Sequence, residues 1–423
     1  MSGAAALGIG LPSTTARAAT GPTPAPSTNA AVSSAFPDRP RTFVTVRGGF
    51  FNLDNRPFRF AGTNTYYLHQ QSHYMIDAAL NDAKAMGLSV VRAWAFADGS
   101  GQSYAPLQPS PYVYDDDAFD ALDYAVWKAG TLGIRLVLPL VNNWSAYGGM
   151  PQYVTWFLGL PDDSLGDGVN HDRFYTTKAI KDCYKAWVRH VTHRRNPYTG
   201  LHYNADPTIM TWQLGNEPRC RSDKSGLTLL GWVREMSGWI RRQAPRQLVA
   251  VGDEGFYGEA GNEDYPYSDY EGARWKDFIA LPTIDYGTAH IYAVPWGETT
   301  ANGKDPVAWG AKWIRDHIAD AEDAGKPLVL EEYGLVVGSD PAVPDEDARL
   351  AAYKRWTGTI ERAGYSASDQ FWILTSRVDD GSLYPNYDGY RVVWWNDDTA
   401  NPTNALATML AAHAERMAKA PKE

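Results

Sequence analysis

The sequence has little cysteine and no long apolar run. Its 423 residues include only two cysteines, Cys183 and Cys220. Their spacing does not suggest a zinc site. They are consistent with one disulfide or with two buried thiols, and the sequence alone leaves both open. No apolar run approaches the roughly 20 residues that cross a membrane, so we expect no membrane partner.

Positive charge is also scarce. The chain has 39 Lys and Arg against 49 Asp and Glu, which gives a formal net charge of −10. A nucleic-acid partner would require a basic face, so we expect none. Nothing in the sequence resembles a phosphate loop, a nucleophile elbow or a His-Glu-x-x-His metal motif. We therefore predict no cofactor and no metal.

The N-terminal segment differs in composition from the rest of the chain. An apolar stretch at 4–11 precedes Ala16-Arg17-Ala18-Ala19, which resembles the small-residue cleavage site of a secretory signal. Because the positive start of such a signal is missing, we expect the printed start to truncate a longer one; a disordered Ala-rich tail is the alternative. We predict a secreted, extracellular protein in which 1–37 is residual leader and 38–423 forms one domain.

From residue 41 onward, strand-like and helix-like segments alternate. The predicted strands are 58–66, 89–96, 135–141, 208–214, 247–251, 283–291, 328–330 and 368–374. The predicted helices are 76–86, 117–132, 174–193, 227–243, 306–324, 346–363 and 403–418. This alternation predicts a parallel sheet, and eight such units predict an α/β fold of the (β/α)₈ TIM-barrel type. An open doubly wound sheet is the alternative.

Two of these strands are followed by carboxylates beside Pro or Gly. Glu217 follows the fourth strand, and Glu331 and Glu332 follow the seventh. Burying an unpaired carboxylate costs several kcal/mol, so such residues usually lie where a barrel opens to solvent. Since strands four and seven lie nearly opposite each other, we expect two carboxyls about 5 Å apart, as in retaining glycoside hydrolysis. The acid should have a raised pKa, while a cation such as Arg92 keeps the other pKa low; a rim salt bridge is the alternative for Arg92.

The motifs around these acids resemble glycoside hydrolase family 5. Asn216-Glu217-Pro218 matches that family's acid/base element, and a glutamate before an aromatic residue and Gly matches its nucleophile. The resemblance implies a retaining (β/α)₈ hydrolase with Glu217 as acid/base and Glu332 as nucleophile. Because adjacent side chains of a strand point to opposite faces, we expect only one of Glu331 and Glu332 to face the site.

Further matches to the family imply supporting roles. Arg92 matches the arginine near the nucleophile, and Asn216 matches the residue that hydrogen-bonds the sugar's 2-hydroxyl. His290 and Tyr292 share a face of the sixth strand and match a His-x-Tyr pair whose tyrosine hydrogen-bonds the nucleophile. Trp372 matches the tryptophan that floors the sugar subsite beside the cleaved bond.

Several loops resemble the endo-β-1,4-mannanases within this family. By that resemblance, Trp144 and Arg219 contact sugars on the leaving-group side; a structural fork on a loop carbonyl is the alternative for Arg219. We expect the neighbouring acids Asp253 and Glu254 to be hydrogen-bonding or solvated groups rather than catalytic ones. The motifs that carry the resemblance are 140–144, 147–149, 218–220, 255–258 and 380–385.

We therefore predict an endo-acting, monomeric mannan hydrolase whose partner is a polysaccharide. The 16 Trp and 25 Tyr support this, because aromatic faces pack against sugar C–H surfaces; a Trp-rich core is the alternative. A β-1,4-glucanase or an exo-β-mannosidase would use the same chemistry. A non-catalytic sugar-binding barrel would lack one carboxylate, whereas this chain has both.

Overall fold

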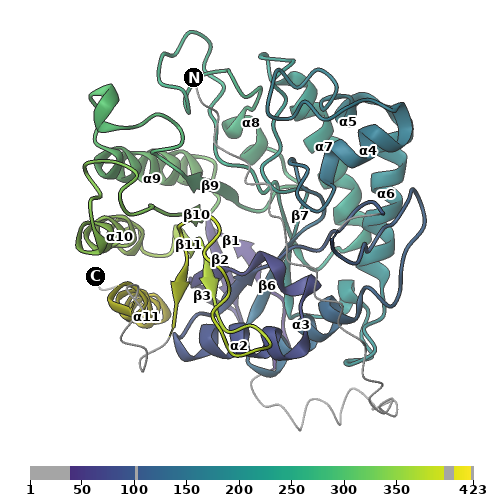
Figure 1. Ribbon diagram of the computed structural model, residues 1–423, viewed down its shortest axis with the longest axis horizontal. Helices are drawn as coiled ribbons and strands as arrows, with labels where there is room; N and C mark the ends of the chain where they lie inside the picture. Colours follow the sequence, from purple (N-terminus) through teal and green to yellow (C-terminus); the bar gives the residue numbers. More distant parts are fainter. Residues whose placement is uncertain (1–38, 101–102, 395–403, 421–423) are drawn as a thin grey trace.

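Eight parallel strands form the central sheet of the computed structural model, which describes residues 39–100, 103–394 and 404–420 (Figure 1). The predicted leader, 1–37, lies outside the described residues. All eight predicted strands are present, and the TIM-barrel prediction is confirmed. They are β4 (Ala61–Asn64), β5 (Val90–Arg92), β6 (Arg135–Pro139), β7 (Ile209–Gln213), β8 (Leu248–Ala250), β9 (Gly287–Ile291), β10 (Leu328–Tyr333) and β11 (Ala367–Phe371).

The hydrogen-bonded order of this sheet is β8-β7-β6-β5-β4-β11-β10-β9. Its two outer strands, β8 and β9, are consecutive in the chain. Two backbone hydrogen bonds connect these strands with residues that flank the other strand. Asp285 N, before β9, donates to Val249 O of β8 (2.8 Å), and His290 N of β9 donates to Glu254 O after β8 (3.0 Å). The sheet therefore nearly closes into a barrel in which β8 and β9 lie between β7 and β10.

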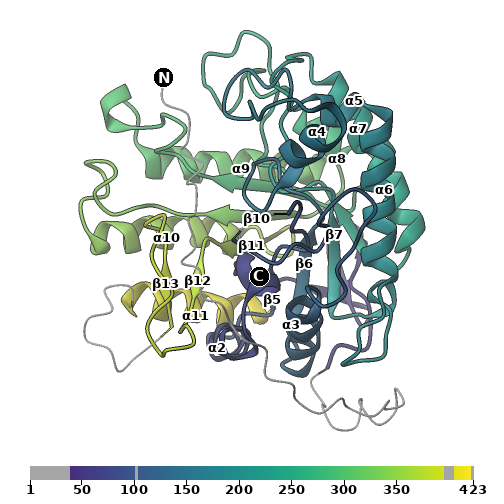
Figure 2. The ribbon, with the colours of Figure 1, turned by 45° about the vertical axis from the view of Figure 1, so that its right-hand side comes forward.

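The helices lie around the outside of the sheet (Figures 1 and 2). Several begin at the sequence signals expected of a helix N-terminus. Ser72 and Asp345 accept hydrogen bonds from the first turns of their helices, and Asp305 does so before a proline. The main helices are α2 (His73–Ala85), α3 (Asp120–Thr131), α6 (Lys178–His193), α7 (Leu227–Gln243), α9 (Pro306–Asp323), α10 (Glu346–Arg362) and α11 (Asn404–Ala418).

A three-stranded antiparallel sheet that we did not predict closes the N-terminal end of the barrel. It consists of β1 (Thr45–Arg47), β2 (Phe50–Leu53) and β3 (Arg56–Phe58). Both of its turns have positive φ at their two central residues, Gly48-Gly49 and Asp54-Asn55, which is typical of tight hairpins. Phe51 is fully buried in the same apolar cluster as Val90 and Val329 of the barrel. This end is therefore filled, and a site must lie at the other.

The remaining elements lie mostly in the loops. Between β8 and β9 the chain forms α8 (Trp275–Ile279), and the loop after β6 contains α4 (Gly149–Leu158), a helix that we did not predict. The others are α5 (Arg173–Thr176), η1 (Tyr66–Gln70), η2 (Tyr203–Ala205), η3 (Thr300–Asn302), β12 (Leu374–Thr375) and β13 (Val392–Val393).

The thiols and the tryptophans contribute to the core. Cys183 and Cys220 are both buried and free, so the disulfide alternative is wrong. Among the described helices, none is long and apolar enough to cross a membrane. Six tryptophans are among the largest fully buried side chains, which bears out the core alternative for these positions: Trp187, Trp212, Trp232, Trp275, Trp313 and Trp356.

Candidate active site

A cavity of about 370 Å³ opens at the carboxyl ends of the barrel strands. Arg92 and His290, fully buried, contact the acids that line it. Glu332 lies on β10 and Glu217 follows β7, so the two acids belong to the strands that we predicted. Seven of the predicted site residues line the cavity: Trp144, Asn216, Glu217, Arg219, Tyr292, Glu332 and Trp372.

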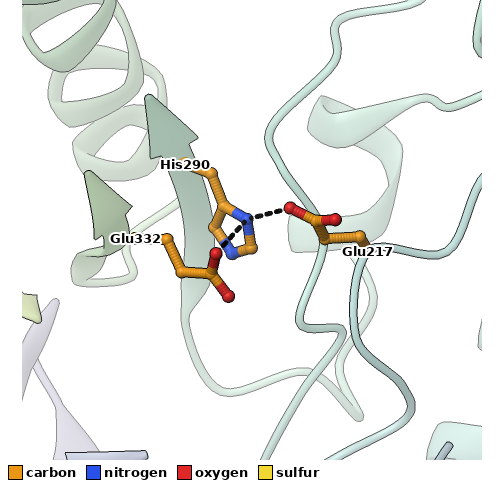
Figure 3. A group of neighbouring side chains, drawn as sticks. All are labelled: Glu217, His290 and Glu332. Carbon is orange, nitrogen blue, oxygen red and sulfur yellow. Dashed lines mark hydrogen bonds and ion pairs between the residues drawn. The ribbon is translucent and has the colours of Figure 1, made fainter. Parts of the chain in front are cut away.

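The two candidate catalytic acids approach each other across this mouth (Figure 3). Single ligand atoms of Glu217, His290 and Glu332 all lie within 4.8 Å of one another. This separation agrees with the roughly 5–5.5 Å of a retaining pair and is shorter than the roughly 6.5–9.5 Å of an inverting pair. The predicted convergence of the two acids is therefore confirmed.

Glu217 lies four residues beyond the end of β7 rather than on the strand itself. Its φ of 54° falls in the left-handed region that non-glycine residues seldom adopt. Its backbone N–H donates to Gly252 O at 2.8 Å and so ties this turn to the chain after β8. Such strained positions concentrate at functional sites.

Glu332 receives two charge-assisted or phenolic hydrogen bonds. Arg92 Nη1 donates to Glu332 Oε1 at 2.5 Å, and the Tyr292 hydroxyl donates to Oε2 at 2.6 Å. Arg92 Nη2 also donates to Asn216 Oδ1 at 2.8 Å. Arg92 is thus the cation beside Glu332, the predicted nucleophile, and because Arg92 is fully buried the rim alternative is wrong.

Glu217 is held by a different pair of donors. Trp144 Nε1 donates to Glu217 Oε2 at 2.7 Å, and His290 Nδ1 lies 2.8 Å from Oε1. Burial lowers the pKa of His290, but the neighbouring carboxylates, Glu332 foremost, outweigh burial and raise this pKa to about 10. The imidazole is therefore protonated near neutral pH and donates to Glu217.

The charge of His290 affects the pKa values of Glu217 and Glu332 differently. Burial raises the pKa of Glu217, but the hydrogen bond and charge of His290 outweigh it and lower the pKa to about 2. Burial raises the pKa of Glu332, which His290 and Arg92 only partly oppose. In the free protein these directions are opposite to our expectation of a raised pKa at Glu217 and a lowered one at Glu332, because His290 hydrogen-bonds to Glu217.

Glu331 is buried beside an irregularity in β10. The pairing of β10 with β9 shifts between Leu330 and Glu332, and a bulge of this kind breaks the alternation of side chains along a strand. Glu331 is fully buried, accepts a hydrogen bond from Gln213 Nε2, and lies 3.4 Å from Arg92 Nε. Both glutamates therefore contact Arg92, but of the two only Glu332 is among the described residues that line the cavity, as we expected.

Arg219 is buried and held by carboxylates rather than by a loop carbonyl. Its Nε donates to Glu254 Oε2 at 2.7 Å and its Nη1 to Glu271 Oε1 at 2.8 Å. The guanidinium lies 4.9 Å from the ring centre of Trp144. Glu254 and Asp253 are buried and hydrogen-bonded, so the hydrogen-bonding interpretation of these two acids is confirmed.

Aromatic side chains form the rest of the wall. Trp372 follows β11 and stacks on Tyr66, with ring centres 5.5 Å apart and planes 7° from parallel. Its Nε1 donates to Asp388 Oδ2 at 2.8 Å. Tyr66, Asp388 and Tyr390 line the cavity but were missed as site residues. Tyr66 begins η1 just after β4, and the other two lie in the segment after β11, where only the position after a barrel strand could have indicated them.

The trio of Glu217, His290 and Glu332 is also the group of described residues whose ligand atoms cluster closely enough for a metal ion. A metal would need the neutral imidazole, whereas His290 carries a proton here. Donors from Trp144, Arg92 and Tyr292 already bond to the carboxylate oxygens. The arrangement fits proton transfer rather than metal binding.

Comparisons with known proteins agree with this geometry. A family model described as "GH family 5 beta-mannosidase-like" matches residues 41–385. Mannan endo-1,4-beta-mannosidase 8 of Oryza sativa subsp. japonica is 39% identical over 80% of this chain and 91% of its own. The endo-beta-1,4-mannanase of Thermotoga petrophila is 39% identical, with a TM-score of 0.76 over 86% of this chain and 78% of its own. The endo-1,4-beta-mannanase of Rhizomucor miehei is 34% identical, with a TM-score of 0.76 over 89% of this chain and 99% of its own.

Proposed function

The chain belongs to glycoside hydrolase family 5, among its β-mannosidase-like members, and we propose that it is an endo-acting β-1,4-mannanase with a retaining mechanism. The observation that carries the mechanism is the approach of Glu217 and Glu332 within 4.8 Å at the mouth of the barrel. The endo-mannanases named above, at 34–39% identity, support the mannan substrate and the endo mode.

In the first step, Glu332 attacks the anomeric carbon and the bond to the leaving sugar breaks. Arg92 and Tyr292 orient the attacking carboxylate and stabilise its charge. Glu217 donates a proton to the leaving oxygen, and it receives that proton from Nδ1 of His290 along their 2.8 Å hydrogen bond. General acid catalysis of this kind contributes about 10²–10⁴-fold in rate.

In the second step, Glu217 acts as a base. It removes a proton from water, which attacks the anomeric carbon and displaces Glu332. That proton returns through Glu217 to His290, so both groups regain their starting state. Asn216, fixed by Arg92 at 2.8 Å and by Asn142 at 3.0 Å, is placed to hydrogen-bond the 2-hydroxyl of the sugar above the Trp372 ring.

Single replacement of each acid tests the catalytic assignment. We expect E217Q and E332Q each to lose most of the turnover of mannan, while E235Q stays at the wild-type rate, because Glu235 pairs with Lys181 and Lys185 on outer helices. Full turnover in both active-site variants would contradict the assignment and favour a sugar-binding barrel.

Product analysis tests the substrate and the endo mode. We expect short oligosaccharides of mixed length from mannan and glucomannan, and much slower release from cellulose. Release of single sugars only would indicate an exo-β-mannosidase, and faster cleavage of cellulose would indicate a glucanase.

We also propose that the protein is secreted, which rests on the composition of residues 4–19. Expression of the natural gene in its own host, followed by N-terminal sequencing of protein from the medium, tests this. Retention of the uncleaved chain inside the cell would contradict it.

A further inference from the structure

Three carboxylates surround the imidazole of His290. Nδ1 lies 2.8 Å from Glu217 Oε1 and 3.7 Å from Glu332 Oε2, whereas Nε2 lies 3.7 Å from Glu331 Oε2. The ring therefore stands between the catalytic pair on one side and Glu331 on the other. The family resemblance gives a role to the first two acids and none to Glu331.

Glu331 forms an ion pair with Arg92 but receives no hydrogen bond from it. Arg92 Nε donates to Gln213 Oε1 at 2.9 Å, and its other nitrogens donate to Glu332, Asn64 and Asn216. Glu331 Oε2 is 3.4 Å from Arg92 Nε, but among the described residues it has no hydrogen-bond partner. His290 Nε2 is another buried atom that lacks one, as are the hydroxyl oxygens of Tyr286 and Thr211. The imidazole nitrogen and the carboxylate oxygen lie 3.7 Å apart.

We propose that Glu331 is a positioning residue that acts through His290: it stabilises the imidazolium at Nε2 and thereby keeps a proton at Nδ1 for delivery to Glu217. The inference rests on the proposed function, since it deepens the acid step. The Nδ1–H bond of His290 breaks as an O–H bond forms on Glu217, and that O–H bond breaks in turn as the leaving oxygen takes the proton. His290 ends neutral, Glu217 ends ionised and the leaving group carries the proton, so the charge and the proton both balance.

The charge count supports this role. Glu217, Glu331 and Glu332 place three carboxylates within 3.7 Å of the His290 ring, and nearby negative charge favours the protonated form of an imidazole. The other titratable groups near His290 form their hydrogen bonds with other residues. Asp253 and Glu254 follow β8 and bond to Thr288 and Arg219, and Tyr292 bonds to Glu332.

The test compares E331Q with wild type on two aryl β-mannobiosides. A dinitrophenolate group leaves without a proton, whereas phenolate needs one, and kcat/KM reports only the first step. We expect kcat/KM of E331Q to fall at least roughly tenfold on the phenyl substrate and to stay within about threefold on the dinitrophenyl substrate. We also expect the alkaline limb of the pH profile of kcat/KM to move to lower pH by about one to two pH units, because an opposite charge near the imidazolium is lost.

A matched control is D369N. Asp369 is a buried carboxylate of β11 that bonds to His413 Nε2 at 2.8 Å and to the Tyr333 hydroxyl at 2.7 Å rather than to His290 or to either proposed catalytic acid. Its replacement should change neither the alkaline limb of the pH profile nor the ratio of kcat/KM on the two substrates. Equal losses of E331Q on both substrates with an unmoved limb would mean a purely structural role and overturn the proposal. If E217Q is inactive while E331Q behaves as wild type, only this inference fails; if E217Q is fully active, the proposed function fails as well.

A measurement on the wild-type protein covers the case in which E331Q does not fold. ¹⁵N NMR of histidine-labelled protein, with the His290 signal assigned through H290N, reports the protonation of both ring nitrogens. We expect His290 to carry protons on both at pH 7, consistent with its pKa of about 10. A neutral imidazole at pH 7 would contradict the proposal.

Discussion

Trp144 donates its indole N–H to Oε2 of Glu217 at 2.7 Å, while His290 occupies the other oxygen of the same carboxyl. The acid/base is thereby fixed at both oxygens before any substrate binds. Both contacts stabilise its ionised form and lower its pKa. The sequence resemblance assigned Trp144 to sugar contact, and the structure adds this second connection.

Replacement of Trp144 tests that connection. We expect W144F to lower kcat/KM on mannan by about tenfold or more, because a hydrogen bond to a charged group contributes about 1.5–3 kcal/mol. The pKa of Glu217 should rise without the indole donor, so the alkaline limb should move to higher pH, opposite to E331Q. W239F is the control, since Trp239 Nε1 donates to the backbone of Lys185 between outer helices. An unmoved limb in W144F would show that the contact has no effect on the acid.

Replacement of Asn216 separates binding from catalysis. A hydrogen bond to the 2-hydroxyl should strengthen as the ring becomes oxocarbenium-like, so we expect N216A to lower kcat by about 100-fold and to raise KM by much less. Steady-state kinetics on a soluble mannan measures both constants. An unchanged kcat with a raised KM would mean that Asn216 contributes equally to the ground state and the transition state.

The parts of the site that the sequence predicted share one physical basis. Glu217, Arg92 and His290 lie at or just beyond the carboxyl ends of apolar strands, and a barrel brings such ends together whatever the loops do. Glu331 could not be placed in this way, because a bulge in β10 overrides the alternation of the strand. The proton on His290 was also beyond the sequence, since it depends on three carboxylates that meet only after folding.

The fold was predictable for the same reason, and its exceptions are instructive. Parallel strands that are buried on both faces are apolar throughout, and they stood out against the helices. The β1–β3 sheet did not, because its strands are three or four residues long and only partly buried. Asp388 and Trp372, which form a hydrogen bond, are 16 residues apart in the chain. Neither hydrophobic periodicity nor residue propensity predicts a contact of this kind.

The β1–β3 sheet should matter for stability but not for chemistry. Phe51 is fully buried, with its ring centre 5.8 Å from Phe60 and 5.3 Å from Tyr286. We expect F51A to lower the free energy of unfolding by about 3–5 kcal/mol, as truncation of a core phenylalanine does, and to leave kcat at low temperature near the wild-type value. Denaturant unfolding and a turnover assay measure the two quantities. A large loss of kcat in a folded F51A protein would contradict the separation of the two ends of the barrel.

His413 of α11 gives the stability of the protein a defined pH dependence. Burial lowers its pKa, but Asp369 and Glu361, whose oxygens lie 2.8 and 2.7 Å from its ring nitrogens, outweigh burial and raise the pKa to about 9. Because the folded pKa lies above the unfolded value of about 6.5, this group stabilises the fold fully below pH 6.5. The contribution is lost as the pH rises to about 9.

The shift corresponds to about 3 kcal/mol at most, at about 1.4 kcal/mol per pKa unit. We therefore expect H413Q to be less stable than wild type at pH 6, and the difference between the two proteins to shrink as the pH rises toward 10. Urea unfolding of both proteins across this range measures it. A difference that stays constant from pH 6 to pH 10 would mean that His413 contributes through packing alone, since packing, unlike its charge, does not titrate.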